Sequence, residues 1–221
     1  NIFGFQSLSF DVFLHFAGIL AVIFIFRKDI LNLLNLRKKE NLKYLSLIIL
    51  ATIPAGIIGV LFKKQIESLF SSLFYLGFFF IISGVLVYST KFSKVKKEHI
   101  NFFDSIFIGI FQAIAIVPGI SRSGATISSG LFRGLERQEA AKFSFLTAIP
   151  IVLGASVIEF KDLIFSEIGY GLLIISFIVT FLTSLLVIKM LFKIIKSEKF
   201  YLFGIYNFLL GILILGWSLT G

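Results

Sequence analysis

The stretch "IVPGISRSGATISSG", residues 116–130, interrupts apolar sequence with a proline, a glycine and an arginine set between two serines. Pro118 offers no amide donor, and Gly119 accepts backbone angles that other residues avoid, so an incoming helix is predicted to stop here. A new helix can start directly afterwards with Ser121 or Ser123 as its N-cap. The chain is therefore expected to turn at this point.

The rest of the chain is too apolar for a water-soluble domain. Of its 221 residues, 57% are hydrophobic and 15% are charged, and the mean hydropathy is +1.00. This composition is typical of a protein that lies in a bilayer. The predicted fold class is an all-α integral membrane protein, a polytopic helical bundle. Seven stretches approach the ~20 residues that a spanning helix needs: residues 10–26, 42–62, 73–89, 102–118, 143–160, 168–188 and 200–219.

The formal net charge of +9 comes from basic residues in short segments between the apolar stretches, at 27–43, 91–97 and 189–199. Such segments are expected to be cytoplasmic, with their lysines against anionic lipid headgroups. This distribution favours the lipid bilayer as a partner and gives no reason to expect nucleic acid. The chain has no cysteine, which excludes disulfides and thiolate metal sites.

The predicted sides of the membrane alternate correctly except between the internal segment 91–97 and the less basic segment 161–167. Two apolar stretches lie between these segments, so one of the two does not cross. Three basic residues between the two stretches mark an internal position: Arg133, Arg137 and Lys142. Residues 102–135 are therefore predicted to form a re-entrant hairpin with its turn near Pro118. Such backbone persists at membrane depth only where protein or a water-filled cavity satisfies it, which makes the turn a candidate site.

The two halves of the chain resemble each other. "LFKKQIESLF" at 61–70 is similar to "LFKIIKSEKF" at 191–200, and the two copies run in opposite directions across the membrane. We predict one membrane domain, residues 1–221, built as an inverted-topology repeat with a first copy at 1–100 and a second at 101–221. The second copy carries the hairpin, and the first is expected to lack its own. Inverted repeats place their site between the two copies, so half of this site is expected to be missing.

The predicted helix start after Gly119 is suited to an anion. Its unpaired amides and the positive end of its dipole attract phosphate oxygens, and the planar guanidinium of Arg122 can bind them in pairs. Thr126 lies four residues further on, on the same helical face. A buried arginine at membrane depth is usually functional. The alternative is that Arg122 extends to the interface and the serines only cap a helix.

Other residues near the turn have less specific signals. Gly119 and Gly124 are candidate substrate-binding positions because they permit close approach, and Gln112, two turns before the break, could hydrogen-bond the pocket. Asp104 is expected to anchor the hairpin at the interface. Two glutamates are expected to pair with Arg133, Arg137 or Lys142 at helical spacing: Glu136 and Glu139.

The stretch "GIFQAIAIVPGISRSGATISSGLFRGLERQEAAKFSFLTAIPIVLGAS", residues 109–156, closely resembles the undecaprenyl-diphosphate phosphatase family, also called the bacitracin-resistance proteins. The pattern that carries the resemblance is a Gln six residues before P-G-x-S-R-S-G-x-T, followed by an "AAKFSFL"-like run. Weaker similarity covers most of the chain. The resemblance implies an inverted repeat with two re-entrant hairpins.

The resemblance also implies a function: hydrolysis of the diphosphate of the polyprenyl carrier of cell-wall (peptidoglycan) synthesis, in the bacterial cytoplasmic (inner) membrane. It implies that Ser121, Arg122 and Ser123 are catalytic and that Thr126 binds the diphosphate. A divalent cation, Mg or Ca, is implied as cofactor, and a homodimer is possible. The family's second motif, a glutamate-bearing segment running into P-I-S-S-S-G-H, has no match in residues 1–221, and no metal ligand can be identified in the chain.

Two other functions fit the same features. Inverted repeats with broken helices are common in carriers, so the turn could move a polyprenyl phosphate across the bilayer as a transporter or flippase. The unmatched second motif is compatible with a catalytically incomplete fragment that binds lipid diphosphate. Phosphate release from the substrate discriminates the enzyme from both alternatives.

Overall fold

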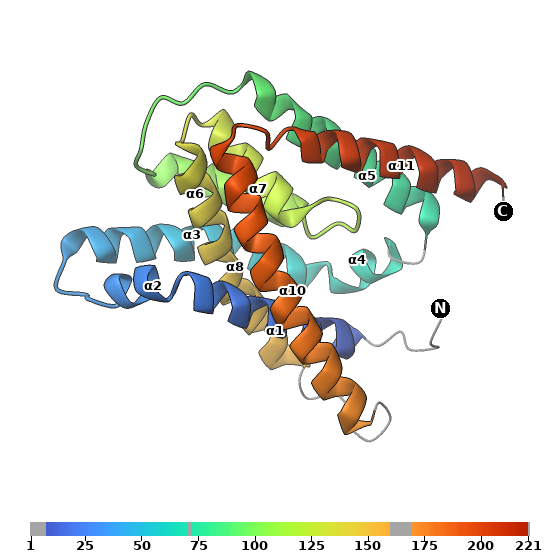
Figure 1. The fold of residues 1–221 in the computed structure, drawn as a ribbon, viewed down its shortest axis with the longest axis horizontal. Helices are drawn as coiled ribbons and strands as arrows, with labels where there is room; N and C mark the ends of the chain where they lie inside the picture. The colour runs from blue at the N-terminus through green and yellow to red at the C-terminus, as the bar shows by residue number, and fades with distance from the viewer. Residues whose placement is uncertain (1–7, 70–71, 160–168, 221) are drawn as a thin grey trace. The chain divides into compact units, whose positions relative to one another are not determined.

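The computed structural model describes residues 8–69, 72–159 and 169–220, and most of these residues are helical. Among them the only β-type pairing is a single bridge between Lys97 and Leu135. The fold class predicted from composition is confirmed. The helices are α1 Leu8–Ile25, α2 Arg27–Leu33, α3 Lys39–Leu61, α4 Lys63–Leu69, α5 Leu73–Tyr88, α6 Phe102–Ile114, α7 Arg122–Phe132, α8 Arg137–Glu159, α10 Tyr170–Lys196 and α11 Leu202–Thr220, with a 3-10 turn at Ser89–Phe92 (Figure 1).

Five of these helices are long and apolar enough to cross a membrane: α3, α5 with its 3-10 extension, α8, α10 and α11. Helix α6 has 13 residues, and at 1.5 Å per residue it rises only about 20 Å, well short of a bilayer core. This length agrees with the prediction that the stretch at 102–118 does not cross. The apolar part of α1, Phe13–Ile25, is also short, and its crossing stays a prediction.

The chain forms two compact units, one of residues 1–42 and 148–190 and the other of residues 43–147 and 191–221. In the first unit α1 lies against α10. The rings of Phe13 and Phe177 are 5.7 Å apart, and those of Phe24 and Phe181 are 6.4 Å apart. The proposed boundary between two sequence repeats at residue 100 stays a prediction.

The second unit, which we call the hairpin unit, contains α5 and α11 side by side (Figure 1). Two glycines seven residues apart in each helix make this contact possible: Gly77 and Gly84 in α5, and Gly204 and Gly211 in α11. A Cβ on Gly77 would lie 2.8 Å from the Leu215 amide nitrogen and 3.0 Å from the Gly211 carbonyl oxygen. The two backbones are therefore in direct contact, as small residues permit between membrane helices.

Helices α6 and α7 pack on each other, and α7 also packs on α5. Helix α6 begins with a capping box, in which Asn101 Oδ1 accepts from the Asp104 amide and Asp104 Oδ2 accepts from the Asn101 amide, each at 3.0 Å. Reciprocal capping of this kind satisfies the first amides of a helix. The start of the hairpin is thus fixed by its own sequence.

Candidate functional site

The chain reverses between α6 and α7, as the Pro-Gly pair predicts. Helix α6 ends at Ile114 and α7 begins at Arg122. Gly119 has a φ of +92°, and a Cβ there would lie 2.6 Å from the Leu76 carbonyl oxygen of α5. No other residue adopts this backbone so readily or fits this space. The predicted break is confirmed, and its depth in a membrane stays a prediction.

Ser121 is the N-cap of α7, so the structure chooses between the two serines that the sequence offered. Its Oγ accepts from the Gly124 amide at 3.1 Å, and its carbonyl accepts the first intrahelical bond, from Ala125, at 2.8 Å. The amides of Arg122 and Ser123 precede the intrahelical ladder and have no acceptor within it. These two donors sit at the positive end of the helix dipole.

The backbone amide of Ser121 is held from behind by two other helices. It donates to Ser83 Oγ of α5 at 3.0 Å, and the same oxygen accepts from Asn207 Nδ2 of α11 at 3.3 Å. Both side chains are buried. A chain of hydrogen bonds therefore ties the start of α7 to the α5–α11 pair.

The guanidinium of Arg122 is anchored at one end by Gln112. Arg122 Nη2 donates to Gln112 Oε1, and Gln112 Nε2 donates to the Ala51 carbonyl of α3 at 3.0 Å. Gln112 is only 1% exposed and both ends of its amide are paired, so it fixes the orientation of the guanidinium. Arg122 Nε is buried and has no acceptor among the described residues. A buried donor without an acceptor is costly unless a ligand supplies one.

Of the remaining predicted residues, Ser123 is open to a ligand, whereas Thr126 and Gly124 support the helix start. Ser123 is half-buried, and its hydroxyl has no hydrogen-bond partner in the described part of the chain. Thr126 is fully buried; its hydroxyl donates to the Arg122 carbonyl at 2.9 Å and lies 2.5 Å from Ser144 Oγ. A Cβ on Gly124 would lie 2.9 Å from Ser121 Oγ. Thr126 and Gly124 therefore shape the start of α7.

The base of the hairpin is closed by a buried carboxylate. Asp104 is 0% exposed; it accepts from Lys97 Nζ at 2.6 and 2.7 Å and from Arg133 Nε at 2.8 Å. Burial would raise the pKa of this carboxyl, but its hydrogen bonds to Lys97, Arg133 and the Asn101 amide outweigh burial and hold the pKa below its usual value. The carboxylate thus stays ionised between two cations.

The ion pairs differ from the expectations for two arginines, and a pairing of Lys142 with Glu136 or Glu139 stays a prediction. Asp104, expected as an interfacial anchor, is a buried ion-pair partner, and its position at a membrane interface stays a prediction. Arg133 pairs with Asp104, 29 residues away, and Arg137 pairs with Glu198 of the α10–α11 turn at 3.4 Å. Helical spacing favoured Glu136 or Glu139 as partners of these arginines, but spacing is silent about contacts between helices.

Three polar residues of the site were missed from sequence: Ser83, Ser144 and Asn207. Each lies in a helix long and apolar enough to cross a membrane, where polar side chains are rare and usually paired. That rarity is the signal that could have singled them out. Their partners could not have been named, because Ser83 meets Asn207 across 124 residues of sequence.

The described residues do not supply a metal site. Among residues 8–69, 72–159 and 169–220, no three His, Asp or Glu side chains come together in a way that could hold an ion. The buried carboxylate nearest in sequence to the turn, Asp104, is occupied by Lys97 and Arg133. The divalent cation implied by the resemblance does not fit the described side chains, and no step of the chemistry is assigned to it.

These features define a class of protein. The chain is a multi-pass helical membrane protein in which a helix break presents an anchored guanidinium, two unpaired amides and a free hydroxyl to an anion. Helix starts and arginine forks are the usual phosphate-binding groups of proteins.

Residues 1–213 match the protein family described as "Bacitracin resistance protein BacA", and the chain belongs to this family. Three relatives carry the name undecaprenyl-diphosphatase. One from Methanobrevibacter smithii is 35% identical over 97% of this chain and 86% of its own length. One from Methanococcus vannielii is 38% identical over 95% of this chain and 85% of its own length. One from Methanothermobacter thermautotrophicus is 43% identical over 78% of this chain and 99% of its own length.

Proposed function

We propose that the chain is a membrane phosphatase that hydrolyses undecaprenyl diphosphate to undecaprenyl phosphate and inorganic phosphate, recycling the carrier of cell-wall synthesis. Membership of the family and the names of its relatives support this activity. The location that we propose is the cytoplasmic (inner) membrane, with the basic segments between the spans on its cytoplasmic side.

The reaction places definite demands on the site. A water oxygen attacks the terminal phosphorus, the phosphoanhydride P–O bond breaks, and the bridging oxygen leaves on the lipid phosphate. Negative charge spreads over the oxygens of the phosphoryl group during transfer, so fixed donors and cations contribute most of the catalysis. A positively charged, pre-oriented pocket is therefore the feature to look for.

The α7 start meets this demand with this chain's own groups. Arg122 contributes its unpaired Nε and its remaining N–H groups to the phosphoryl oxygens, and the amides of Arg122 and Ser123 add two more donors. The free hydroxyl of Ser123 completes the set. Ser121 acts as the cap that holds the helix start open. The observation that carries the proposal is the buried Arg122 Nε, which has no acceptor among the described residues.

The other predicted residues act through these groups. Gln112 orients the guanidinium through its bond to Arg122 and its anchor on Ala51. Thr126 fixes the first turn of α7 through the Arg122 carbonyl. Gly119 and Gly124 allow the turn and the helix start to lie against α5 and Ser121. We assign all four to positioning rather than to contact with the diphosphate.

The test uses the chain reconstituted in liposomes with undecaprenyl diphosphate and measures inorganic phosphate. Arg122→Ala is expected to lower phosphate release about 10³-fold, the scale on which removal of an arginine that stabilises a phosphoryl transition state acts. Arg37→Ala, at an exposed arginine of the α2–α3 segment, is the matched control and should leave the rate unchanged.

Full turnover in Arg122→Ala would refute the assignment. Movement of the headgroup across the liposome without phosphate release would favour a transporter. Tight binding of the substrate with neither event would favour a lipid-binding protein.

A further inference from the structure

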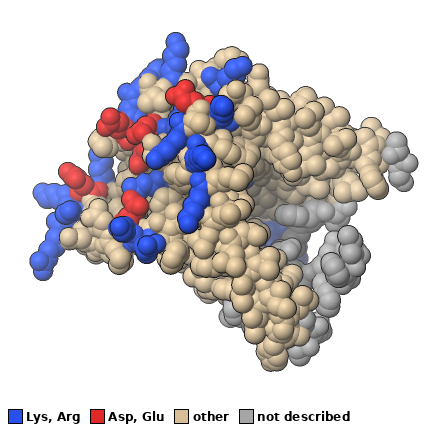
Figure 2. Space-filling model, viewed as in Figure 1, with Lys and Arg blue, Asp and Glu red and all other residues tan. Residues whose placement is uncertain are grey.

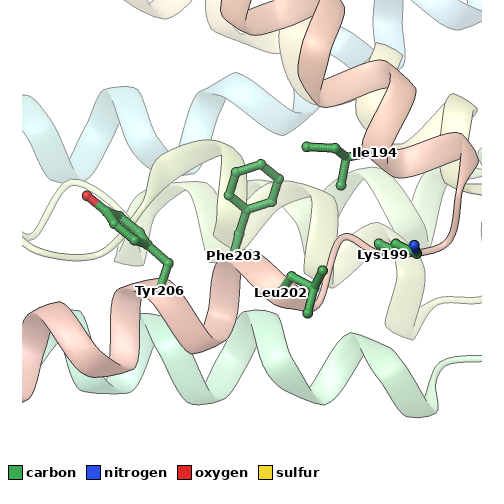
Figure 3. A pocket seen from close by; sticks show the side chains of 5 residues that line it. All are labelled: Ile194, Lys199, Leu202, Phe203 and Tyr206. Carbon is green, nitrogen blue, oxygen red and sulfur yellow. The ribbon is translucent and has the colours of Figure 1, made fainter.

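A surface cavity of about 390 Å³ lies in the hairpin unit, and its lining contains none of the residues assigned to the phosphate site. We call it the α10–α11 groove, because its lining comes from the end of α10, the turn that follows and the start of α11. Figure 3 shows its five residues, with Lys199 at the turn and Tyr206 furthest along α11: Ile194, Lys199, Leu202, Phe203 and Tyr206.

The groove wall is apolar. Ile194, Leu202 and Phe203 line it with carbon atoms alone, and Lys199 lines it with its aliphatic stem while its ammonium lies at the edge, the one charge among the lining residues. Leu202 is 44% exposed and Tyr206 63% exposed, so the groove is open at the surface of the unit. Its shape and chemistry fit a molecule with an apolar chain and a negative head.

The surroundings of Lys199 reinforce its charge. Lys193 and Lys196 lie in the last turn of α10, and Lys91 Nζ lies 5.4 Å from the centre of the Tyr201 ring. The one acidic residue of the turn, Glu198, pairs with Arg137 at 3.4 Å and does not neutralise Lys199. The end of the groove therefore carries an excess of positive charge.

The location of the turn indicates where the groove lies in a membrane. Both α10 and α11 are long and apolar enough to cross, so the turn that joins them lies at headgroup depth. Lysine and tyrosine are the residues that proteins place at this depth. Figure 2 shows basic side chains gathered over part of the face, while the surface of α11 beyond its start is free of charge.

We propose that the α10–α11 groove binds one anionic phospholipid, with its phosphate at Lys199 and an acyl chain along Leu202, Phe203 and Tyr206. The positive end selects the headgroup charge, and the apolar length holds the chain. The site is separate from the diphosphate site at Arg122, and the proposal does not depend on hydrolysis. Its occupant is a lipid of the surrounding bilayer and not the substrate.

The chain offers a direct probe because it contains one tryptophan. Trp217→Phe combined with Phe203→Trp places the sole indole in the groove. The variant is reconstituted in phosphatidylcholine vesicles that contain phosphatidylglycerol or phosphatidylcholine with brominated acyl chains at equal mole fraction. Brominated phosphatidylglycerol is expected to bind about fivefold more strongly than brominated phosphatidylcholine, as measured by quenching, which is the preference that one lysine near the surface gives.

Lys199→Gln in the same background should lower the preference for phosphatidylglycerol several-fold, and the remaining preference is that of the neighbouring lysines. Lys94→Gln, an exposed lysine outside the groove, should keep the preference and serves as the matched control. An unchanged thermal midpoint in all variants shows that each is folded.

Three results would overturn the proposal. The first is equal quenching by the two lipids in the parent variant. The second is an unchanged preference in Lys199→Gln. The third is displacement of brominated phosphatidylglycerol by stoichiometric undecaprenyl diphosphate or by a second copy of the chain, since either would make the groove a site for that occupant.

Discussion

The α5–α11 pair and the α6–α7 hairpin both contain small residues, but these residues have different structural roles in the two regions. In α5 and α11, glycines at matching seven-residue intervals bring two backbones into contact. In α7, Gly124 and the serines lie around a helix start whose donors are partly unpaired. The close packing of α5 on α11 makes the scaffold rigid. At the start of α7, hydrogen-bond donors without an acceptor remain available to an anion.

The comparison shows that the hydrogen-bond donors where the scaffold meets α7 are paired, whereas a donor of the site is unpaired. The scaffold meets the start of α7 at Ser83, whose Oγ accepts from the Ser121 amide and from Asn207 Nδ2. The guanidinium of Arg122, by contrast, has one anchored end and one unpaired nitrogen. Changes on the hairpin should therefore alter turnover, whereas changes between α5 and α11 should alter stability.

Among substitutions that test this separation of site and scaffold, Gln112→Leu is expected to have the largest effect, a fall in turnover. It removes the acceptor of Arg122 and replaces the glutamine with an apolar side chain of similar size, so the guanidinium loses its fixed orientation. A misplaced catalytic group costs about 100-fold in turnover. The fall should appear in kcat for phosphate release per folded molecule, in addition to the stability lost when the Ala51 carbonyl loses its donor.

Gln65→Leu, at an exposed glutamine of α4, is the control and should turn over normally. A Gln112→Leu enzyme whose kcat is normal would show that the guanidinium is oriented by something else.

The next effect concerns the scaffold. Gly77→Ala forces a methyl group against the backbone of α11, which cannot yield as a side chain can. Overpacking of this kind destabilises by about 2 kcal/mol. Thermal unfolding in detergent should show the loss, while kcat per folded molecule stays close to that of the wild type.

Gly56→Ala in α3 meets open space and should be neutral or slightly stabilising, since alanine favours a helix over glycine. A Gly77→Ala protein of normal stability but low kcat would contradict the separation of scaffold and site.

A smaller effect is expected where the two regions join. Ser83→Ala leaves the Ser121 amide and the Asn207 amide without their shared acceptor. The loss of one such hydrogen bond, about 1.4 kcal/mol, corresponds to a tenfold fall in kcat. Ser46→Ala removes a hydroxyl that bonds only the Lys43 carbonyl of its own helix, at 2.7 Å, and should have no effect.

If Ser83→Ala changed stability and left kcat untouched, Ser83 would belong to the scaffold alone.

The smallest effect is expected at the base of the hairpin. The pKa of Asp104 is lower in the folded chain than its usual 3.8, so its ionised form contributes stability above that value and the contribution is lost as the pH falls through the folded pKa. Asp104→Asn should lower stability by about 1 kcal/mol at neutral pH, since its partners are partly exposed.

The variant should also lose less stability than the wild type between pH 5 and the lower folded pKa. The matched control is Glu98→Gln, at an exposed residue. A stability profile with the same acid limb in Asp104→Asn and wild type would show that Asp104 is not the group that titrates.

The sequence predicted those features that depend on neighbouring residues. Pro118 and Gly119 were sufficient to place the break, Ser121 was one of two predicted caps, and hydropathy predicted the fold class. Ser83, Asn207 and the partners of Asp104 could not be predicted, because they are joined by contacts between helices far apart in the chain. The side-chain type alone gives no partner for such contacts, and helical spacing suggested the wrong one for Arg133.

The central claim is that the start of α7 binds the diphosphate. The most direct test asks whether an anion protects a cysteine at the turn from chemical labelling. The chain has no cysteine, so Ile120→Cys, next to the α7 start, gives a single thiol whose labelling rate can be measured. Pyrophosphate should slow labelling several-fold, and Arg122→Ala in the same background should abolish the protection. A labelling rate that pyrophosphate leaves unchanged would contradict the assignment of the α7 start as the diphosphate site.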